Sequence, residues 1–268
     1  MINSIDLAKE IRKDAVIATS KAHAGHIGSI LSIADIIAVL YSDILRKDKT
    51  GSDVFLDKFI LSKGHAGLAV YSALAEIGII DKKELLETYY KDGSKFSGHV
   101  SSKGIPGIEL STGSLGQGIG VAVGLALARK IDKSNARVFA LVGNGECNEG
   151  SVWEALMFAS SHKLSNLTII VDNNKLQSMG ESAKIIDMGN LKEKFASFGC
   201  EVEEIDGHNH KQIKLALNIK PKDKPLLVIC NTIKGKGVAM MENNNAYHSK
   251  YVSELELNKV LAEIEGKR

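Results

Sequence analysis

The chain has 268 residues, of which 44% are hydrophobic and 25% are charged, a composition typical of a globular protein and not of a disordered or fibrous one. Its 34 Lys and Arg balance 32 Asp and Glu, so the chain carries no strong positive field and we expect no nucleic-acid partner. No segment approaches the roughly 20 apolar residues that a membrane span requires, and we expect none.

Three cysteines lie far apart, without C-x-x-C spacing: Cys147, Cys200 and Cys230. This odd number argues against both a disulfide framework and a structural zinc site. The first 25 residues carry charges throughout and lack the apolar core of a signal peptide. We therefore expect a cytoplasmic protein in a reducing compartment.

Short apolar runs bounded by turn residues alternate with segments of helical periodicity. In chain order, the predicted helices are residues 5–19, 31–45, 68–77, 116–128, 151–162 and 211–217. The predicted strands lie within residues 57–65, 138–142, 167–171, 200–205 and 226–231. This order predicts an α/β fold with a mostly parallel sheet flanked by helices.

Polar and glycine-rich segments connect these elements. Residues 23–29 form a loop with two histidines, and residues 89–120 are too rich in Gly, Ser and Lys to be one regular element. A long irregular loop in a compact domain is more often functional than idle. Residues 232–237, TIKGKG, could by themselves be a flexible basic loop that binds nothing, and His208 is interpreted as structural.

Residues 139–180 are the segment around which we expect the chain to be organised. Two predicted strands end there on Gly143-Asn144-Gly145 and Asp172-Asn173-Asn174, and the helix between them implies that they are parallel. Both polar clusters then lie at carboxyl ends of neighbouring strands, where open α/β sheets bind ligands. The amide oxygens of Asn144 and Asn174 suit a hard cation such as Mg²⁺. Two tight βα turns would explain the same residues.

This segment resembles the diphosphate-binding segment of thiamine-diphosphate enzymes, which begins with Gly-Asp-Gly and ends in an Asn pair. Glu146, Glu149-Gly150 and Trp153-Glu154-Ala155 make it similar to transketolase in particular. Residues 111–118, STGSLGQG, resemble a specific transketolase signature, and further family-like segments follow the same order along nearly the whole chain. The resemblance implies a thiamine diphosphate-binding (PP-type) fold in which residues 1–268 form a single domain.

The resemblance also implies roles for individual residues. The implied cofactor-binding residues are Ser29, His65, Gly113, Ser114, Leu115, Gly145, Glu149, Asn174, Lys234 and His248. The implied catalytic residues are His26, His99, His248 and Glu149. Glu149 would support a carboxylate that a partner subunit contributes to the site. The implied Mg²⁺ ligands are Asn144, Asn174 and the carbonyl of Leu176.

The sequence departs from the family pattern at three positions. Asn144 stands where the family carries a metal-binding Asp, which leaves the metal affinity open. Ile27 replaces a Pro, which affects the stiffness of the loop. Ser249 stands where a Gly usually follows His248, so the match at His248 is looser.

Full-length transketolases are much longer than this chain. The resemblance implies that the carboxylate that activates the cofactor and the sugar-phosphate clamps belong to a pyrimidine-binding domain, and we expect this chain to lack both that domain and the C-terminal domain. The resemblance therefore implies the N-terminal subunit of a split transketolase. With thiamine diphosphate, Mg²⁺ and a C-terminal partner subunit, it would transfer a two-carbon ketol unit from a ketose to an aldose. We also expect self-association and sugar or sugar-phosphate substrates.

Two other interpretations stay open. The chain could serve a related thiamine-diphosphate enzyme of specialised sugar biosynthesis, which product analysis with several donors would reveal. It could also be a non-catalytic scaffold subunit that has lost metal affinity through Asn144. Cofactor titration in the presence of Mg²⁺ distinguishes that case.

Overall fold

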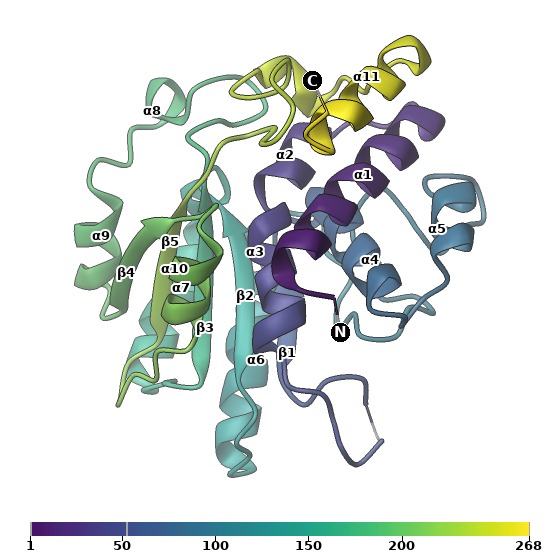
Figure 1. Cartoon of the computed structure of the whole chain (residues 1–268). Coiled ribbons are helices and arrows are strands. Elements are labelled where there is room, and N and C mark those ends of the chain that lie inside the picture. Colours follow the sequence, from purple (N-terminus) through teal and green to yellow (C-terminus); the bar gives the residue numbers. More distant parts are fainter. Residues whose placement is uncertain (1, 52, 268) are drawn as a thin grey trace.

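The computed structural model describes residues 2–51 and 53–267. Its centre is a five-stranded sheet in which every neighbouring pair is parallel, in the order β1-β2-β3-β5-β4 (Figure 1). The strands are β1 Lys58–Leu61, β2 Val138–Gly143, β3 Leu167–Asn173, β4 Glu201–Asp206 and β5 Leu226–Asn231. Parallel strands place all their carboxyl ends at one edge of the sheet, which is where the site lies.

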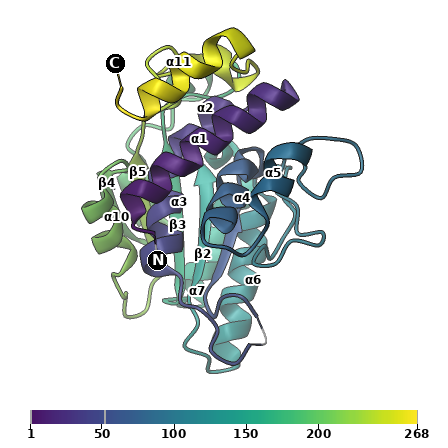
Figure 2. The same ribbon diagram turned by 45° about the vertical axis from the view of Figure 1, so that its right-hand side comes forward.

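Helices cover both faces of the sheet. The helices around one core are α1 Ser4–Ala22, α2 Ile27–Ser32, α3 Ala34–Val39, α4 Gly67–Glu76, α5 Lys82–Thr88, α10 His210–Leu217 and α11 Glu254–Ile264. Those around the other core are α6 Gln117–Ile131, α7 Gly150–Ser161 and α9 Leu191–Ser197, and the short helix α8, Ser182–Ile185, precedes α9. The first and last helices, α1 and α11, lie side by side (Figures 1 and 2).

Strand β2 shows how one sheet serves two cores. Phe139 and Leu141 belong to the core with α1 and α3, whereas Val138, Ala140 and Val142 belong to the core with α6 and α7. Successive side chains of a strand point to opposite faces, so a strand covered on both faces must be apolar throughout. This is why the run 138–142 has no polar alternation.

Every predicted strand and helix is present, with some shifted bounds. The helix expected from residue 31 begins at Ile27, so Ser29 lies inside α2 and not in the loop predicted for residues 23–29, which corrects that prediction. That helical stretch is also interrupted at Ile33 and ends in a π-helical turn, Leu40–Ile44. His65 lies in a 3-10 turn, Gly64–Ala66, directly after β1.

The three cysteines are buried free thiols, in agreement with the expected lack of disulfides. Burial raises the pKa of Cys200 to about 12, which leaves it an unreactive thiol. Within residues 2–51 and 53–267, no helix has the length and apolar character needed to cross a bilayer.

Candidate active site

A cavity of about 390 Å³ opens at the carboxyl edge of the sheet, a volume within the range of small-molecule sites. The segments that follow four of the strands contribute to its wall. Lys63 and His65 come after β1, Asn144 after β2, Asn174 after β3 and Lys234 after β5. These strand-end residues, of which Lys63 and Lys234 are 171 positions apart, face one ligand-sized space because the parallel topology brings the strand ends together.

The cavity wall contains every predicted site residue except Ser114. These lining residues are His26, Ser29, His65, His99, Gly113, Leu115, Asn144, Gly145, Glu149, Asn174, Leu176, Lys234 and His248. Ser114 is exposed in the same turn as Gly113 and Leu115, and its carbonyl accepts a hydrogen bond from the Gln117 backbone N–H at the start of α6. Its side chain is therefore not part of the described wall.

Four histidines form a cluster centred on His26. The ring centroid of His26 lies 5.4 Å from that of His65, 5.3 Å from that of His99 and 5.2 Å from that of His248. The backbone N–H of His26 also donates to the carbonyl of His248 (2.8 Å), which ties α2 to the C-terminal part of the chain. His26 has φ = +70°, an unusual value for a residue with a side chain and one often found at functional sites.

Three histidines of this cluster, His26, His65 and His248, have a pKa below the ordinary value and are therefore neutral near neutral pH. Burial, followed by the neighbouring histidines and lysines, lowers the pKa of His26 to about 4. Burial and the nearby Lys234 and Lys63 lower the pKa of His248 to about 4. The pKa of His65 also falls well below its ordinary value, mainly through burial. Neutral imidazoles can each donate one hydrogen bond and accept another near neutral pH.

Lys234 presents a buried ammonium group to the cavity. Its Nζ lies 3.3 Å from the carbonyl oxygen of Gln177, 3.2 Å from Oδ1 of Asn245 and 3.4 Å from Nδ1 of His248. These partners are neutral, and burial together with the charge of Lys63 lowers the pKa of Lys234 to about 8. An ammonium without a carboxylate among these contacts is suited to bind an anionic ligand.

A second lysine, Lys63, also lines the cavity and was not predicted. The Nζ of Lys63 contacts Oδ2 of Asp172 at 2.5 Å, and both residues are buried. Asp172 also accepts hydrogen bonds from Ser32 Oγ (2.7 Å), Thr232 Oγ1 (2.5 Å) and Asn174 Nδ2 (3.1 Å). The pair therefore fixes Asn174 and the start of the segment after β5.

Glu146 joins three segments of the wall. Its Oε1 accepts hydrogen bonds from Ser62 Oγ and from the Gly116 backbone N–H (2.9 Å), and its Oε2 accepts one from the Gly143 N–H (3.1 Å). Burial raises its pKa although these bonds and Lys63 favour the charged form. From the sequence, Glu146 contributed only to the family resemblance, and its position inside a glycine-rich turn was the available signal of a local role.

Two amides and one backbone carbonyl form the expected metal-binding part of the wall. The Nδ2 of Asn144 donates to Ser182 Oγ (2.5 Å), and the Nδ2 of Asn174 donates to Ser32 Oγ (3.1 Å). The carbonyl oxygens are therefore the side-chain atoms that these amides offer to a cation. Oδ1 of Asn174 also accepts from the backbone N–H of Leu176 (3.0 Å). Such neutral oxygen donors fit Mg²⁺ when a polyanionic ligand supplies the negative charge.

The parallel sheet, the histidine cluster and the lysines at one strand edge define an α/β domain for an anionic cofactor. Residues 4–264 match the family of transketolase thiamine diphosphate binding domains, and the chain belongs to this family. Among its relatives, the 6-deoxy-6-sulfo-D-fructose transketolase subunit of a Clostridium species is 37% identical over 96% of this chain and 94% of its own length. An apulose-4-phosphate transketolase subunit from Actinobacillus succinogenes is 40% identical over 96% of this chain and 94% of its own length.

The solved structures give the same result for the fold. Transketolase from Campylobacter jejuni superposes with a TM-score of 0.89 at 32% identity, over 98% of this chain and 42% of that one. The chain thus spans about two fifths of a full-length transketolase and nearly all of the two relatives named as subunits. The predicted family, α/β fold and split-subunit type are confirmed, and the chain is a subunit of the two-subunit transketolase class.

Proposed function

We propose that the chain, as a single diphosphate-binding domain, holds thiamine diphosphate and Mg²⁺ in the cavity at the carboxyl edge of the sheet. With a partner subunit it would transfer a two-carbon ketol unit from a ketose to an aldose. The observation that supports this most directly is the meeting of the histidine cluster and Lys234 with the ends of β2 and β3 in one cavity. When bound, thiamine diphosphate supplies the carbanion chemistry for breaking and forming a carbon–carbon bond.

The chain's own residues would bind and orient the cofactor. Lys234 and the imidazoles of His65 and His248 would donate hydrogen bonds to diphosphate oxygens, with Ser29 beside them. Backbone groups of Gly113, Leu115 and Gly145 in the wall, and of Ser114 in the same turn, would bind the aminopyrimidine and the diphosphate. Asn144, Asn174 and the carbonyl of Leu176 would hold the cation.

The histidines would handle the protons of the substrate. His26, at the centre of the cluster, and His99 and His248 beside it would hydrogen-bond sugar oxygens and move protons at them. His99 and Glu149 are exposed, so they lie where substrate or a partner chain can reach them. Glu149 would support a carboxylate of the partner.

We infer that the partner carries the pyrimidine-binding domain. Support comes from the two relatives named as transketolase subunits, which have nearly the same length as this chain. Self-association of the chain, sugar or sugar-phosphate substrates and a cytoplasmic location complete the proposal. The alternative is a related thiamine-diphosphate reaction of specialised sugar biosynthesis, and product analysis with several donors separates the two.

Calorimetric titration of the chain, purified with its partner, tests the proposal. Thiamine diphosphate with Mg²⁺ should bind, and His65→Ala should weaken binding by about 1.5–3 kcal/mol, the scale of a hydrogen bond to a charged group. His26→Ala should instead lower turnover and leave the affinity nearly unchanged. His23→Ala is the matched control, because His23 is an exposed loop histidine that stacks on Tyr251. Absence of binding to the unaltered protein would refute the proposal and favour a scaffold role.

A further inference from the structure

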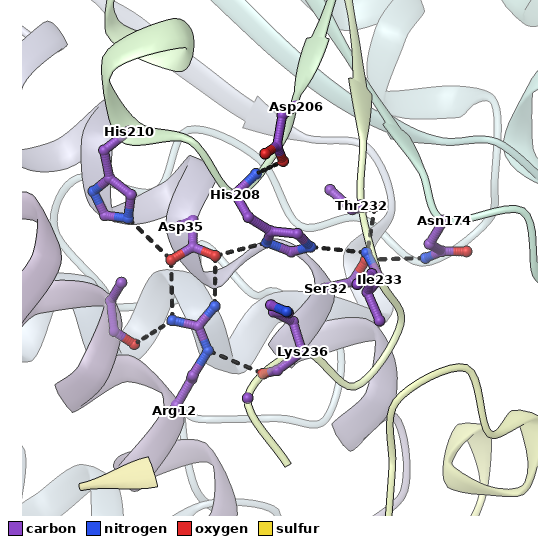
Figure 3. A network of polar contacts seen from close by, with 12 residues as sticks. Arg12, Ser32, Asp35, Asn174, Asp206, His208, His210, Thr232, Ile233 and Lys236 are labelled. Atoms are coloured by element: carbon purple, nitrogen blue, oxygen red, sulfur yellow. Dashed lines mark hydrogen bonds and ion pairs between the residues drawn. The ribbon is translucent and has the colours of Figure 1, made fainter. Parts of the chain in front are cut away.

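A buried polar network centred on Asp35 of α3 lies beside the proposed site and has no role in the function described so far (Figure 3). Asp35 accepts hydrogen bonds from both terminal nitrogens of Arg12 (3.0 and 2.5 Å). Two histidines from the segment after β4 also contact its carboxylate, His208 through Nδ1 (2.7 Å) and His210 through Nε2 (3.0 Å). Burial opposes the charge, but these histidines and Arg12 hold the pKa of Asp35 well below its ordinary value.

His208 differs from His210 in what its second ring nitrogen does. Nε2 of His208 accepts a hydrogen bond from the backbone N–H of Ile233 (2.8 Å), and Figure 3 shows the ring bridging Asp35 and Ile233. An accepting Nε2 has no proton, so Nδ1 is the nitrogen that donates to Asp35. Nδ1 of His210 instead contacts Ser4 Oγ (2.9 Å), at the start of α1. Only one of the two rings therefore reaches the chain segment after β5.

That segment, residues 232–236, is here called the Lys234 loop. The hydroxyl of Thr232 donates to Asp172 at one end of the loop, and Arg12 Nε donates to the carbonyl of Lys236 (3.0 Å) at the other. The bond from Ile233 to His208 lies between these anchors, next to Lys234 itself. The network thus holds the loop at two points, through His208 and Arg12, that both depend on Asp35.

The direct contacts of the Lys234 ammonium are too weak to fix its position. All three are 3.2–3.4 Å long, and none of them is to a carboxylate. The Lys234 backbone in turn accepts from the Asn243 N–H (2.9 Å), and the Gly235 N–H donates to the Gly28 carbonyl of α2 (2.9 Å). Where the ammonium lies in the cavity therefore depends on where the loop backbone is held.

We propose that His208 is a positioning residue of the cofactor site: its ring, held by Asp35, binds the Ile233 N–H and so places the Lys234 ammonium where it meets the diphosphate. This inference rests on the proposed function, in which Lys234 binds the cofactor. A purely structural network would instead join α1, α3 and the segment after β4, and its loss would lower stability without a specific effect on cofactor affinity. His210, with the same Asp35 partner, provides the comparison.

The test compares His208→Ala with His210→Ala in the chain purified with its partner. Each variant removes one hydrogen bond to Asp35, from side chains of similar exposure (13% and 18%). Calorimetry with thiamine diphosphate and Mg²⁺ should give an affinity lowered about tenfold for His208→Ala, the scale of one hydrogen bond. His210→Ala should stay within about twofold of the unaltered protein at a comparable loss of Tm.

A second pair of variants keeps the test decisive if His208→Ala does not fold. His208→Asn can reach the position of Nδ1 and keep the contact with Asp35, but it is too short to reach Ile233. His208→Gln has the length to place its amide oxygen where Nε2 accepts the Ile233 N–H. Weaker cofactor binding by His208→Asn than by His208→Gln supports the inference.

Two results would overturn it. One is an equal affinity for the Asn and Gln variants; the other is an equal change of affinity for His208→Ala and His210→Ala. Failure of the proposed function looks different, because the unaltered protein would then not bind thiamine diphosphate at all. In that case the inference falls together with the function on which it rests.

Discussion

Asn144 removes a negative charge from the proposed metal site but keeps an oxygen donor in place. The three expected ligands are then two amide oxygens and one backbone carbonyl, and Lys63 nearby is already paired with Asp172. Charge count is a main determinant of affinity for hard cations. A cation should therefore enter this site together with the diphosphate and bind poorly alone.

Asn144→Asp should restore metal binding without cofactor. We expect the affinity for Mg²⁺ alone to rise by on the order of tenfold, while activity with the partner is retained. Calorimetric titration with Mg²⁺ measures this. Asn190→Asp is the charge-matched control, since Asn190 caps α9 through its side chain and Asp serves equally well as a cap. Cofactor binding that is independent of any divalent metal would show that the proposed metal site is wrong.

The histidine cluster should make the stability of the chain depend on pH. His26 and His248 have a pKa of about 4 in the folded chain and an ordinary value of 6.5, so between these values the unfolded chain binds more protons. Stability should therefore rise from pH 4 to pH 6.5 and level off above that. We expect Tm to fall by about 3 °C or more between pH 7 and pH 5, the shift that ~1 kcal/mol produces in a chain of this size.

Thermal unfolding of the unaltered chain and of a His26→Gln/His248→Asn double variant checks this expectation. The variant lacks two of the three imidazoles whose pKa is lowered, and should show a flatter profile over the same pH range. Other groups that titrate there, such as Asp14 with a pKa raised by burial to about 7, contribute equally to both proteins. Parallel pH profiles for the two proteins would therefore contradict the neutral state assigned to His26 and His248.

At the scale of elements, two glycines of α6 have opposite surroundings. A Cβ on Gly118 would lie 2.8 Å from the Cα of Ser62, directly after β1, whereas a Cβ on Gly120 would meet nothing within 4 Å. The close approach at Gly118 is what lets α6 pack on the end of β1, where Ser62 Oγ also accepts from the Ile119 N–H (3.1 Å). In the sequence, both glycines belong to the same run of small residues, and nothing there separates them.

Gly118→Ala should destabilise the chain by about 1–3 kcal/mol, because the backbone after β1 must shift. Gly120→Ala should stabilise it by about 0.5–1 kcal/mol, since an open helical position gains from losing glycine's entropy. Chemical denaturation of the two variants side by side measures both values. Similar values for the two substitutions would mean that close packing at Gly118 does not contribute to the fold.

The elements that the sequence predicted are those with strong apolar patterns. Strand β2 is apolar on both faces and β3 is buried on both faces, and the sequence marks them by short, mainly apolar runs. The helices α5, α8, α9 and α11 were not predicted. Each of them buries one residue or none, so the periodic signal is weak. The early start of α2 was missed because it depends on the contact of His26 with the distant His248.

In the candidate site, too, the residues with a local sequence signal could be predicted and those that depend on distant contacts could not. The residues of the motifs were identifiable because each motif is local, and their order along the chain matched one family. Lys63 was missed because its partner, Asp172, is 109 positions away, and only the fold brings the two together. The sequence around His208 predicts only a structural role, because Ile233 and Asp35, which its ring contacts in the fold, are distant in the chain.

At the scale of the whole molecule, neither of the two carboxylates in the cavity wall, Glu146 and Glu149, is both buried and free of hydrogen bonds. Glu146 accepts hydrogen bonds from Ser62, Gly116 and Gly143, so its oxygens serve to hold the wall together. Glu149 is exposed at the N-terminus of α7. Within the part of the chain that the structure describes, the wall therefore lacks a buried carboxylate that is available to activate a bound aminopyrimidine.

The isolated chain should accordingly show no ketol transfer, even when saturated with thiamine diphosphate and Mg²⁺. The family resemblance implies that a carboxylate must contact the aminopyrimidine to activate the cofactor, and we infer that the partner supplies it. An assay that couples consumption of a ketose donor to a second enzyme, run with each protein separately and then with both together, measures this directly. The partner alone should be equally inactive, since it lacks Lys234 and the histidine cluster, and activity should appear only on mixing. Steady transfer by the purified chain alone would mean that Glu146 or Glu149 activates the cofactor, and Glu149→Gln would then decide between them.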